Sequence, residues 1–151
     1  MATTVTKTIG TSSRDYSSIQ AFFDAVPSDL VAADELWEGV IYPDSGNTVS
    51  TSTLYTGTKT TDATRYVRLK CATGYSFTEH ANKATNALRA NSSNGVYMSC
   101  ASDSAIIVSN VHLELIGLQL RNTNSGAAAS GINSSKTTIV RQCIIDSYRS
   151  N

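Results

Sequence analysis

A repeat with a nearly fixed offset is the feature that most constrains the fold of this chain. The segments VHLELIGLQLRN (111–122) and KTTIVRQCIIDS (136–147) align without a gap when residue 111 is placed on residue 136. Two earlier pairs of apolar residues continue the series at similar offsets. The aligned positions are Ile107 with Ile132, Ser109 with Ser134, Leu113 with Thr138, Leu115 with Val140, Leu118 with Cys143 and Leu120 with Ile145, preceded by Leu88 and Ala90 and by Val96 and Met98. A period of roughly 22 to 25 residues predicts stacked repeats.

Three short strands and three turns fill one such period, and each strand can pair in parallel with its equivalent in the next coil. A single coil cannot bury its inward face, so the coils must stack. An antiparallel sandwich also uses many short strands, but it predicts hairpin turns and no fixed offset. The sequence therefore predicts an all-β fold, a right-handed parallel β-helix (solenoid) with an N-terminal strand and a short capping helix.

The alternation of side chains within the repeat predicts which residues face the core and which face water. Residues 66–71 are expected to form a strand of the preceding coil, followed by a loop excursion at 72–86. The residues predicted to point inward are Val67, Leu69, Cys71, Leu113, Leu115, Leu118 and Leu120, and those predicted to point outward into water are Glu114, Gln119 and Arg121.

The N-terminal part has a different pattern, with one amphipathic helix expected at 16–26. Its apolar residues recur at helical spacing, Asp15 or Ser17 could cap it, and Pro27 ends it. Strands are expected at 4–9 and through Val40 and Tyr42, with a second short helix at 27–34. We therefore divide the chain into an N-terminal cap region (1–64) and the first coils (65–151).

The repeats at 111–122 and 136–147 resemble those of pectin-lyase-like right-handed β-helix proteins. The opening TVTKTIGTSSRDYSSIQAFFDAVP resembles the N-terminal cap of that group. The segment DATRYVRLKCATGYSF resembles the entry to the first coils in phage and bacterial β-helix proteins. The resemblance implies the fold but not one activity, because lyases, hydrolases, epimerases and inert fibre segments share this scaffold.

Composition excludes several classes of function. The 12 basic and 12 acidic residues cancel and are scattered, so no basic stripe for nucleic acid is present. No apolar run has the length of a signal peptide or a membrane span. The three cysteines, Cys71, Cys100 and Cys143, lack metal-ligand spacing and are expected to be buried thiols.

No acidic residue of the repeats is expected to oppose another acidic residue. Glu114 is aligned with Arg89 and Ile139, and Asp146 is aligned with Arg121; Asp103 is the remaining acid. Glycoside hydrolysis needs two carboxyl groups close together. We therefore predict no catalytic carboxylate pair within these residues.

Other candidate residues are also interpreted as structural. The acidic group Asp34, Glu35 and Glu38 lacks a calcium-loop pattern and is expected to be a solvated turn. His80 and His112 are isolated, with His112 pointing outward, and Trp37 is expected to pack in the cap rather than bind sugar. No catalytic, cofactor-binding or metal-binding residue, and no cofactor, is predicted.

These observations lead us to expect a non-enzymatic structural component of a bacteriophage particle: a tail-fibre, tailspike-like or capsid-decorating β-helix that contacts surface glycans. Its expected partners are other virion proteins and further copies in a homotrimer, without nucleic acid or membrane. It would be made in the host cytoplasm without a signal peptide and be located in the virion. The open parallel edge at 136–151 implies a longer protein or cover by another chain.

Two other functions remain open from the sequence. One is the N-terminal portion of a polysaccharide lyase or glycoside hydrolase whose catalytic residues lie on coils outside this chain. The other is a bacterial surface adhesin that binds glycans through exposed aromatic residues.

Overall fold

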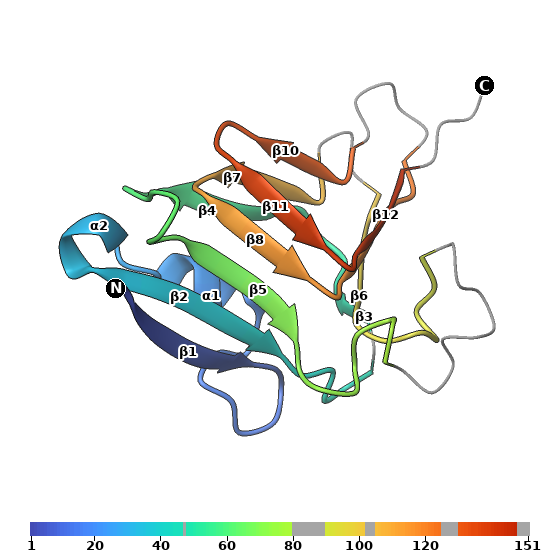
Figure 1. Cartoon of the computed structure of the whole chain (residues 1–151). Coiled ribbons are helices and arrows are strands. Elements are labelled where there is room, and N and C mark those ends of the chain that lie inside the picture. Colours follow the sequence, from blue (N-terminus) through green and yellow to red (C-terminus); the bar gives the residue numbers. More distant parts are fainter. Residues whose placement is uncertain (47, 80–89, 102–104, 125–129, 148–151) are drawn as a thin grey trace.

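The structure, a computed structural model, describes residues 1–46, 48–79, 90–101, 105–124 and 130–147. Within these residues, two short helices and twelve strands follow one another (Figure 1). They are β1 (Thr3–Ile9), α1 (Ile19–Ala25), α2 (Leu30–Ala33), β2 (Glu35–Ile41), β3 (Thr48–Ser50), β4 (Leu54–Thr58), β5 (Val67–Cys71), β6 (Tyr97–Cys100), β7 (Ile107–Asn110), β8 (Leu113–Ile116), β9 (Gln119–Asn122), β10 (Ile132–Ser134), β11 (Thr138–Arg141) and β12 (Ile144–Ser147).

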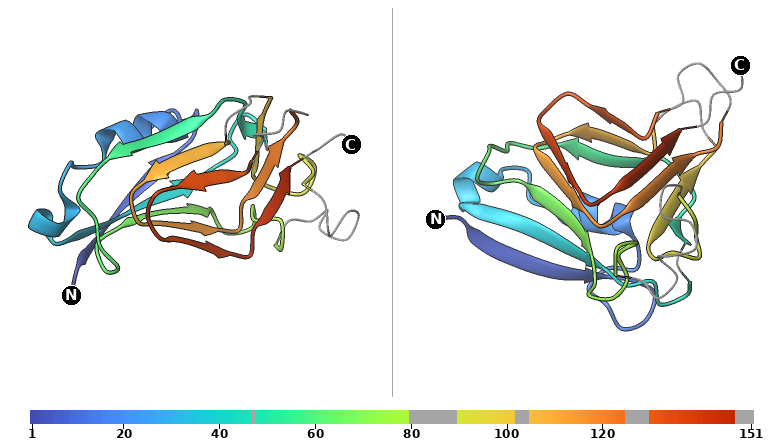
Figure 2. Two further views of the ribbon diagram at one scale, coloured as in Figure 1. Left: turned by 90° about the horizontal axis from the view of Figure 1, so that it is seen from above. Right: turned by 45° about the vertical axis from the view of Figure 1, so that its right-hand side comes forward.

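The strands form three sheets, with the orders β1-β2-β5-β8-β11, β3-β6-β9-β12 and β4-β7-β10. The pairings between these strands are parallel. From β2 onward the chain passes through the three sheets in one repeating order, and we call each pass of three strands a circuit. Figure 2 shows the three sheets facing one another around a shared interior. The prediction of an all-β fold is confirmed.

Strand register confirms the repeat that the sequence predicts. Leu115 lies opposite Val140, Leu120 opposite Ile145, and Ile107 opposite Ile132. The slightly shorter offset that precedes them is also found, with Met98 opposite Leu120. Each offset therefore corresponds to one step from a strand to its neighbour in the same sheet.

One step of the predicted series is wrong. The strand before β8 in its sheet is β5, so Leu69 lies opposite Leu115, nearly twice as far away in the sequence as Leu115 is from Val140. Ala90, aligned with Leu115 by the repeat, lies outside the strands, and Leu88 lies outside the described residues. The offset changes because the circuit from β5 to β7 contains residues 72–96 between its first two strands. The predicted excursion at 72–86 falls in this stretch, with residues 80–86 outside those described.

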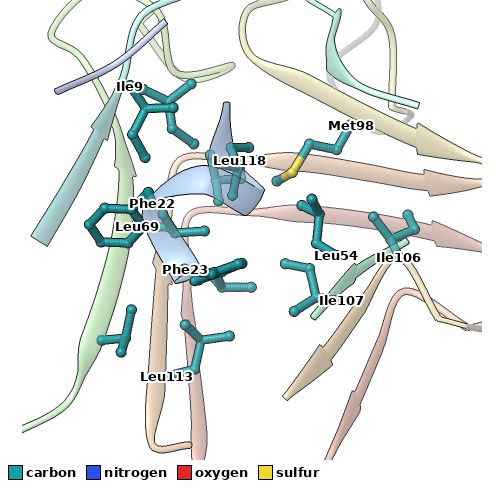
Figure 3. Packing of buried hydrophobic residues seen from close by; sticks show 14 of the residues in the cluster. Ile9, Phe22, Phe23, Leu54, Leu69, Met98, Ile106, Ile107, Leu113 and Leu118 are labelled. Atoms are coloured by element: carbon teal, nitrogen blue, oxygen red, sulfur yellow. The ribbon is translucent and has the colours of Figure 1, made fainter. Parts of the chain in front are cut away.

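The inward side chains of the three sheets form one apolar cluster. All seven residues predicted to point inward belong to it or pack against it, and six of them (all but the half-buried Cys71) are almost fully buried. Figure 3 shows Phe22 and Phe23 of α1 among the side chains of the strands. Close packing of this kind is a large source of stability, because each buried aliphatic side chain contributes roughly 1.5–3 kcal/mol.

Helix α1 covers the end of the cluster and packs mainly against β4, with fewer contacts to β1 and β2. It begins after Ser18, whose hydroxyl accepts a hydrogen bond from the Ala21 amide, so neither Asp15 nor Ser17 is the cap. The helix is shorter than the predicted 16–26. Phe22 approaches the sheet at Gly39, where a Cβ atom would lie only 3.0 Å from the Phe22 ring. The missing side chain at Gly39 therefore makes room for the helix.

The same region closes the edge of β4, the outermost strand of its sheet. The side-chain amide of Gln20 accepts a hydrogen bond from the Tyr55 amide and donates one to the Tyr55 carbonyl, both at 2.9 Å. Thr60, just after β4, exchanges backbone hydrogen bonds with Ser28 and Leu30. The helical segment thus takes the place of a neighbouring strand.

The predicted cap region (1–64) also contains β2, β3 and β4, a full circuit of strands.

Neighbouring residues of β4 offer a test of the inward packing. Leu54 is buried in the core, whereas Tyr55 points outward and is 52% exposed. Leu54→Ala should lower the free energy of unfolding by about 2–5 kcal/mol, because it leaves a cavity. Tyr55→Ala should lower it by less than about 1 kcal/mol. Urea unfolding followed by the fluorescence of Trp37 measures both; equal losses would contradict the described orientation of β4.

Candidate functional site

A column of alternating charges crosses the outer face of the sheet β1-β2-β5-β8-β11. Glu38 of β2 lies opposite Arg68 of β5, and Arg68 lies opposite Glu114 of β8. Lys70 and Arg141 approach these carboxylates from the next outward position of β5 and β11. We call these five residues the charge ladder. Among the described residues, it is the largest group of charged side chains joined by ion pairs.

Each carboxylate of the charge ladder binds two cations. Arg68 donates to Glu114 at 2.6 Å and to Glu38 at 3.1 Å. Lys70 lies 2.9 Å from the second oxygen of Glu38, and Arg141 donates to the second oxygen of Glu114 at 2.7 Å. The hydrogen bonds therefore connect four successive strands of one sheet, β2, β5, β8 and β11.

A tyrosine completes the arrangement around Glu114. The Tyr66 hydroxyl donates to Glu114 at 3.0 Å and accepts from Arg68 at 2.7 Å. Burial, and then the hydrogen bond to Glu114, raise the pKa of Tyr66. Tyr66 consequently stays protonated at neutral pH and acts as a hydrogen-bond donor.

The carboxylates are more buried than the alternation of the strands predicts. Glu114 is 3% exposed and Glu38 is 6% exposed, so the prediction that Glu114 faces water is wrong, as is the placement of Glu38 in a solvated turn. Glu38 is in the middle of β2. The long side chains of the neighbouring strands lie across the sheet and cover both carboxylates. Arg68, not Arg89, is the residue opposite Glu114, because β5 is the neighbouring strand.

Gln119 is a second residue that was predicted to face water and is buried. Its side-chain oxygen accepts a hydrogen bond from the Asn91 amide at 2.9 Å, so the segment before β6 covers it. Arg121, on the same strand, is half-buried and opposite Asp146 as expected, with 3.8 Å between their charged atoms. Whether an outward-pointing residue is exposed to solvent therefore depends on whether a segment outside the strands covers it.

Burial and hydrogen bonding oppose each other at the two carboxylates. Burial alone would raise the pKa of Glu38, but the hydrogen bonds from Lys70 and Arg68 outweigh it and lower the pKa. Burial would likewise raise the pKa of Glu114, and the hydrogen bonds from Arg141, Arg68 and Tyr66 lower it. Both residues therefore carry a full negative charge at neutral pH.

This arrangement suits mechanical support better than acid-base chemistry. Glu38 and Glu114 are two strands apart, about 9.5 Å at the usual spacing, near the upper limit for the carboxyl pair of an inverting glycosidase. A general acid in such a pair needs a raised pKa, whereas both groups here have lowered pKa values. The Arg68 side chain also fills the space between them.

The remaining acidic candidates lie apart from the charge ladder. Asp34 ends α2 in a left-handed conformation and contacts Arg65. Glu35 accepts a hydrogen bond from the indole nitrogen of Trp37 at 2.8 Å. The described residues contain no group of three or more potential metal-binding side chains, and Asp103 lies outside them.

Trp37 and His112 have structural contacts. The Trp37 ring packs against Phe22 at 6.1 Å between centroids, which confirms the predicted packing role. His112 is half-buried, and its Nδ1 atom lies 3.1 Å from the Thr61 hydroxyl. His80 lies outside the described residues. The His112 backbone amide also donates to the Thr61 hydroxyl at 3.0 Å, so this contact fixes the residue before β8 to the segment that follows β4.

The three cysteines are free thiols, and Cys100 is buried as predicted. Cys71 and Cys143 are half-buried rather than fully buried. Burial raises the pKa of both thiols, which keeps them in the unreactive protonated form. Neither described helix has the length and apolar character needed to cross a membrane.

Removal of the central cation tests the charge ladder. Arg68→Met keeps most of the side chain but leaves Glu38 and Glu114 with one cation each. We expect a loss of about 2–4 kcal/mol in the free energy of unfolding, because removing one member of a largely buried ion pair leaves the other charge buried without its partner. Arg65→Met is the matched control, since the side chains of its partners Asp34 and Asp62 are 58% and 36% exposed, far more than those of Glu38 and Glu114, and these pairs should contribute less than about 1 kcal/mol. Equal effects in urea unfolding would contradict the buried role of Arg68.

Acid should destabilise the protein through the same two carboxylates. Their pKa values are lower in the folded chain than in the unfolded chain, so the unfolded state takes up protons first as the pH falls. Stability from the charge ladder should be complete near pH 7 and be lost progressively below about pH 4. Urea midpoints across this range measure the loss. In Glu114→Gln the slope below pH 4 should be shallower, and an unchanged slope would contradict the assignment.

Comparison with protein-family models, with curated protein sequences and with solved structures found no match. The resemblance to pectin-lyase-like repeats therefore remains a prediction from the quoted residues. The features of the chain that bear on its function are the strand order, the charge ladder and the exposed surfaces.

Proposed function

We propose that the chain is a right-handed parallel β-helix and serves as a non-enzymatic structural component of a bacteriophage particle. The repeating passage through three parallel sheets supports the solenoid, since each strand neighbours its equivalent one circuit away. The right hand follows from the strong preference of parallel strand connections for that hand. A stack of this kind is a stiff rod, because each circuit is bonded to the next along three sheets.

The observation that carries the structural role is the state of the two buried carboxylates. Both are charged, both are bound to two cations, and neither is free to transfer a proton. Together with the parallel backbone bonds, they connect successive circuits on the outer face. The outer face is thus built to hold layers together.

A position on the particle surface, in a tail fibre, tailspike or capsid decoration, suits such a rod. Its partners would be other virion proteins and further copies of the chain, and its location would be the virion. Contact with host surface glycans could use exposed aromatic residues, since Tyr55 and Tyr75 are 52% and 41% exposed. Aromatic faces of this kind can stack on sugar rings.

Mass spectrometry of purified phage particles tests the proposal directly. We expect the chain to be present at a constant ratio to the capsid or tail proteins through successive purification steps. Its absence from particles, while it is present in the infected-cell lysate, would overturn the virion role.

Assays of polysaccharide cleavage test the enzyme alternative. The chain should release neither reducing ends nor unsaturated products from capsular and pectic polysaccharides. Cleavage that is lost in Glu38→Gln and Glu114→Gln, but kept in Tyr55→Ala, would make the charge ladder a catalytic site and replace the proposal. Cleavage that survives all three changes would place the chemistry elsewhere on the protein.

A further inference from the structure

A hollow lies on the outer face of the sheet β1-β2-β5-β8-β11, beside the charge ladder. It opens near the start of β1 and β2 and next to the turn that precedes β5, and its volume is about 580 Å³. Its lining includes Thr4, Leu36, Thr64, Arg65, Tyr66 and Arg68, and we call it the outer hollow. We propose that the outer hollow binds a small organic carboxylate with an apolar body. The proposal is independent of the role in a particle.

The outer hollow has the size and the lining of a ligand site. Sites for small molecules usually measure roughly 300–1,000 Å³ and are lined mainly by apolar groups around a few polar ones. Two further hollows in the described structure measure only about 60 and 90 Å³. Leu36, on the outward side of β2, and Tyr66 supply apolar surface, and Met1 and Ala2 add to it. This surface suits a ligand with an apolar body.

Arg65 brings hydrogen-bond donors to this apolar surface. Its Nε and Nη2 atoms donate to the Asp62 carboxylate, and its Nη1 atom donates to Asp34 at 3.4 Å. Among the described residues, these contacts use three of the five N–H groups of the guanidinium, so two remain for a ligand. Asp62 is itself held by the backbone amides of Thr64 and Arg65, both at 2.8 Å. The Arg65 guanidinium is therefore in place before a ligand binds.

Arg68 is held in the same way by the charge ladder. Its Nε atom donates to Glu114, its Nη1 atom to Glu38, and its Nη2 atom to the Tyr66 hydroxyl. Within the described structure, two of its five N–H groups likewise remain for a ligand. Donors that are already fixed lose little conformational entropy on binding, which favours affinity.

The acceptors around the two arginines are already engaged, and this sets the charge of the ligand. Both oxygens of Glu38 and both oxygens of Glu114 bind cations of the charge ladder. The lining of the outer hollow carries two arginines and one carboxylate, Asp34. Spare donors in a lining with an excess of positive charge favour a ligand that is an anion, because charge-assisted hydrogen bonds are the stronger ones.

A carboxylate with an apolar body fits better than an inorganic anion or a neutral molecule. A carboxylate offers two oxygens to the guanidinium N–H groups. Inorganic phosphate leaves the apolar surface of Leu36 and Tyr66 in contact with water, whereas an aryl or alkyl group covers it. A neutral amide gains no charge-assisted hydrogen bond. The two features together define the ligand class.

NMR titration of the 151-residue chain with hydrocinnamate, a phenyl group joined to a carboxylate, tests the proposal. We expect saturable shifts of the backbone amide signals of Leu36, Thr64 and Arg65, with a Kd of millimolar order. Hydrocinnamide, acetate and inorganic phosphate each lack the charge or the apolar body and should bind at least about tenfold more weakly. No saturable shift with hydrocinnamate, or equal binding of any of these three probes, would overturn the proposal.

Substitutions test the placement of the carboxylate. Arg65→Met should weaken hydrocinnamate binding at least about tenfold, because charge-assisted hydrogen bonds are lost. Arg14→Met is the matched control, since Arg14 pairs with Asp44 away from the outer hollow, and its Kd should be unchanged. Asp34→Asn should bind about two- to fivefold more tightly, because a negative charge beside the ligand is removed. Circular dichroism checks that each variant is folded. No loss in Arg65→Met, an equal loss in Arg14→Met, or no gain in Asp34→Asn would each contradict the site.

N-acetylphenylalanine distinguishes two sources of the same chemistry. It resembles the last residue of a protein chain, whereas hydrocinnamate resembles a free organic acid. We expect hydrocinnamate to bind more tightly, because the additional amide of N-acetylphenylalanine loses water against the apolar surface of Leu36. Tighter binding of N-acetylphenylalanine would overturn the free acid as the ligand and assign the outer hollow to the end of another chain.

Discussion

The stacking of inward aliphatic side chains across parallel strands is the interaction on which the rest of the structure depends. No single circuit can bury its inward residues, so each layer is stable only against its neighbours. The register of Leu115 with Leu69 on one side and Val140 on the other shows this dependence within one column. The backbone hydrogen bonds follow the same register. Stability is therefore shared between layers and cannot be assigned to any one of them.

Polar groups are arranged to protect this apolar stack at its edge and on its outer face. At the edge of β4, the Gln20 amide satisfies the backbone amide and carbonyl of Tyr55. On the outer face, cations cover the carboxylates of Glu38 and Glu114 and fix the relative positions of four strands. Both arrangements use side chains of the strands and of a short helix.

The sequence predicts the stack well and its surroundings poorly, for a physical reason. The offset between Leu120 and Ile145 reflects strand pairing directly, so the register follows from the pattern. The offset fails between Leu69 and Leu115 because residues inserted within a circuit change the spacing without changing the pairing. That failure also gave Glu114 the wrong partner. Alternation indicates the side of a strand on which Gln119 lies, but not that a segment before β6 covers it. Nothing in the helical pattern marks Gln20 as a substitute for a strand.

The order of signs along the outer column restricts which layer the stack can lose. Negative, positive and negative side chains occupy three successive strands at Glu38, Arg68 and Glu114. Loss of the single layer that contains Arg68 would put two carboxylates on adjacent strands, about 4.8 Å apart, where they repel each other. Loss of Arg68 together with one of the two carboxylates would leave a single negative charge in the column and no such repulsion. The layer that contains Arg68 is thus the one that this column cannot lose without bringing like charges together, a restriction that a purely aliphatic column does not impose.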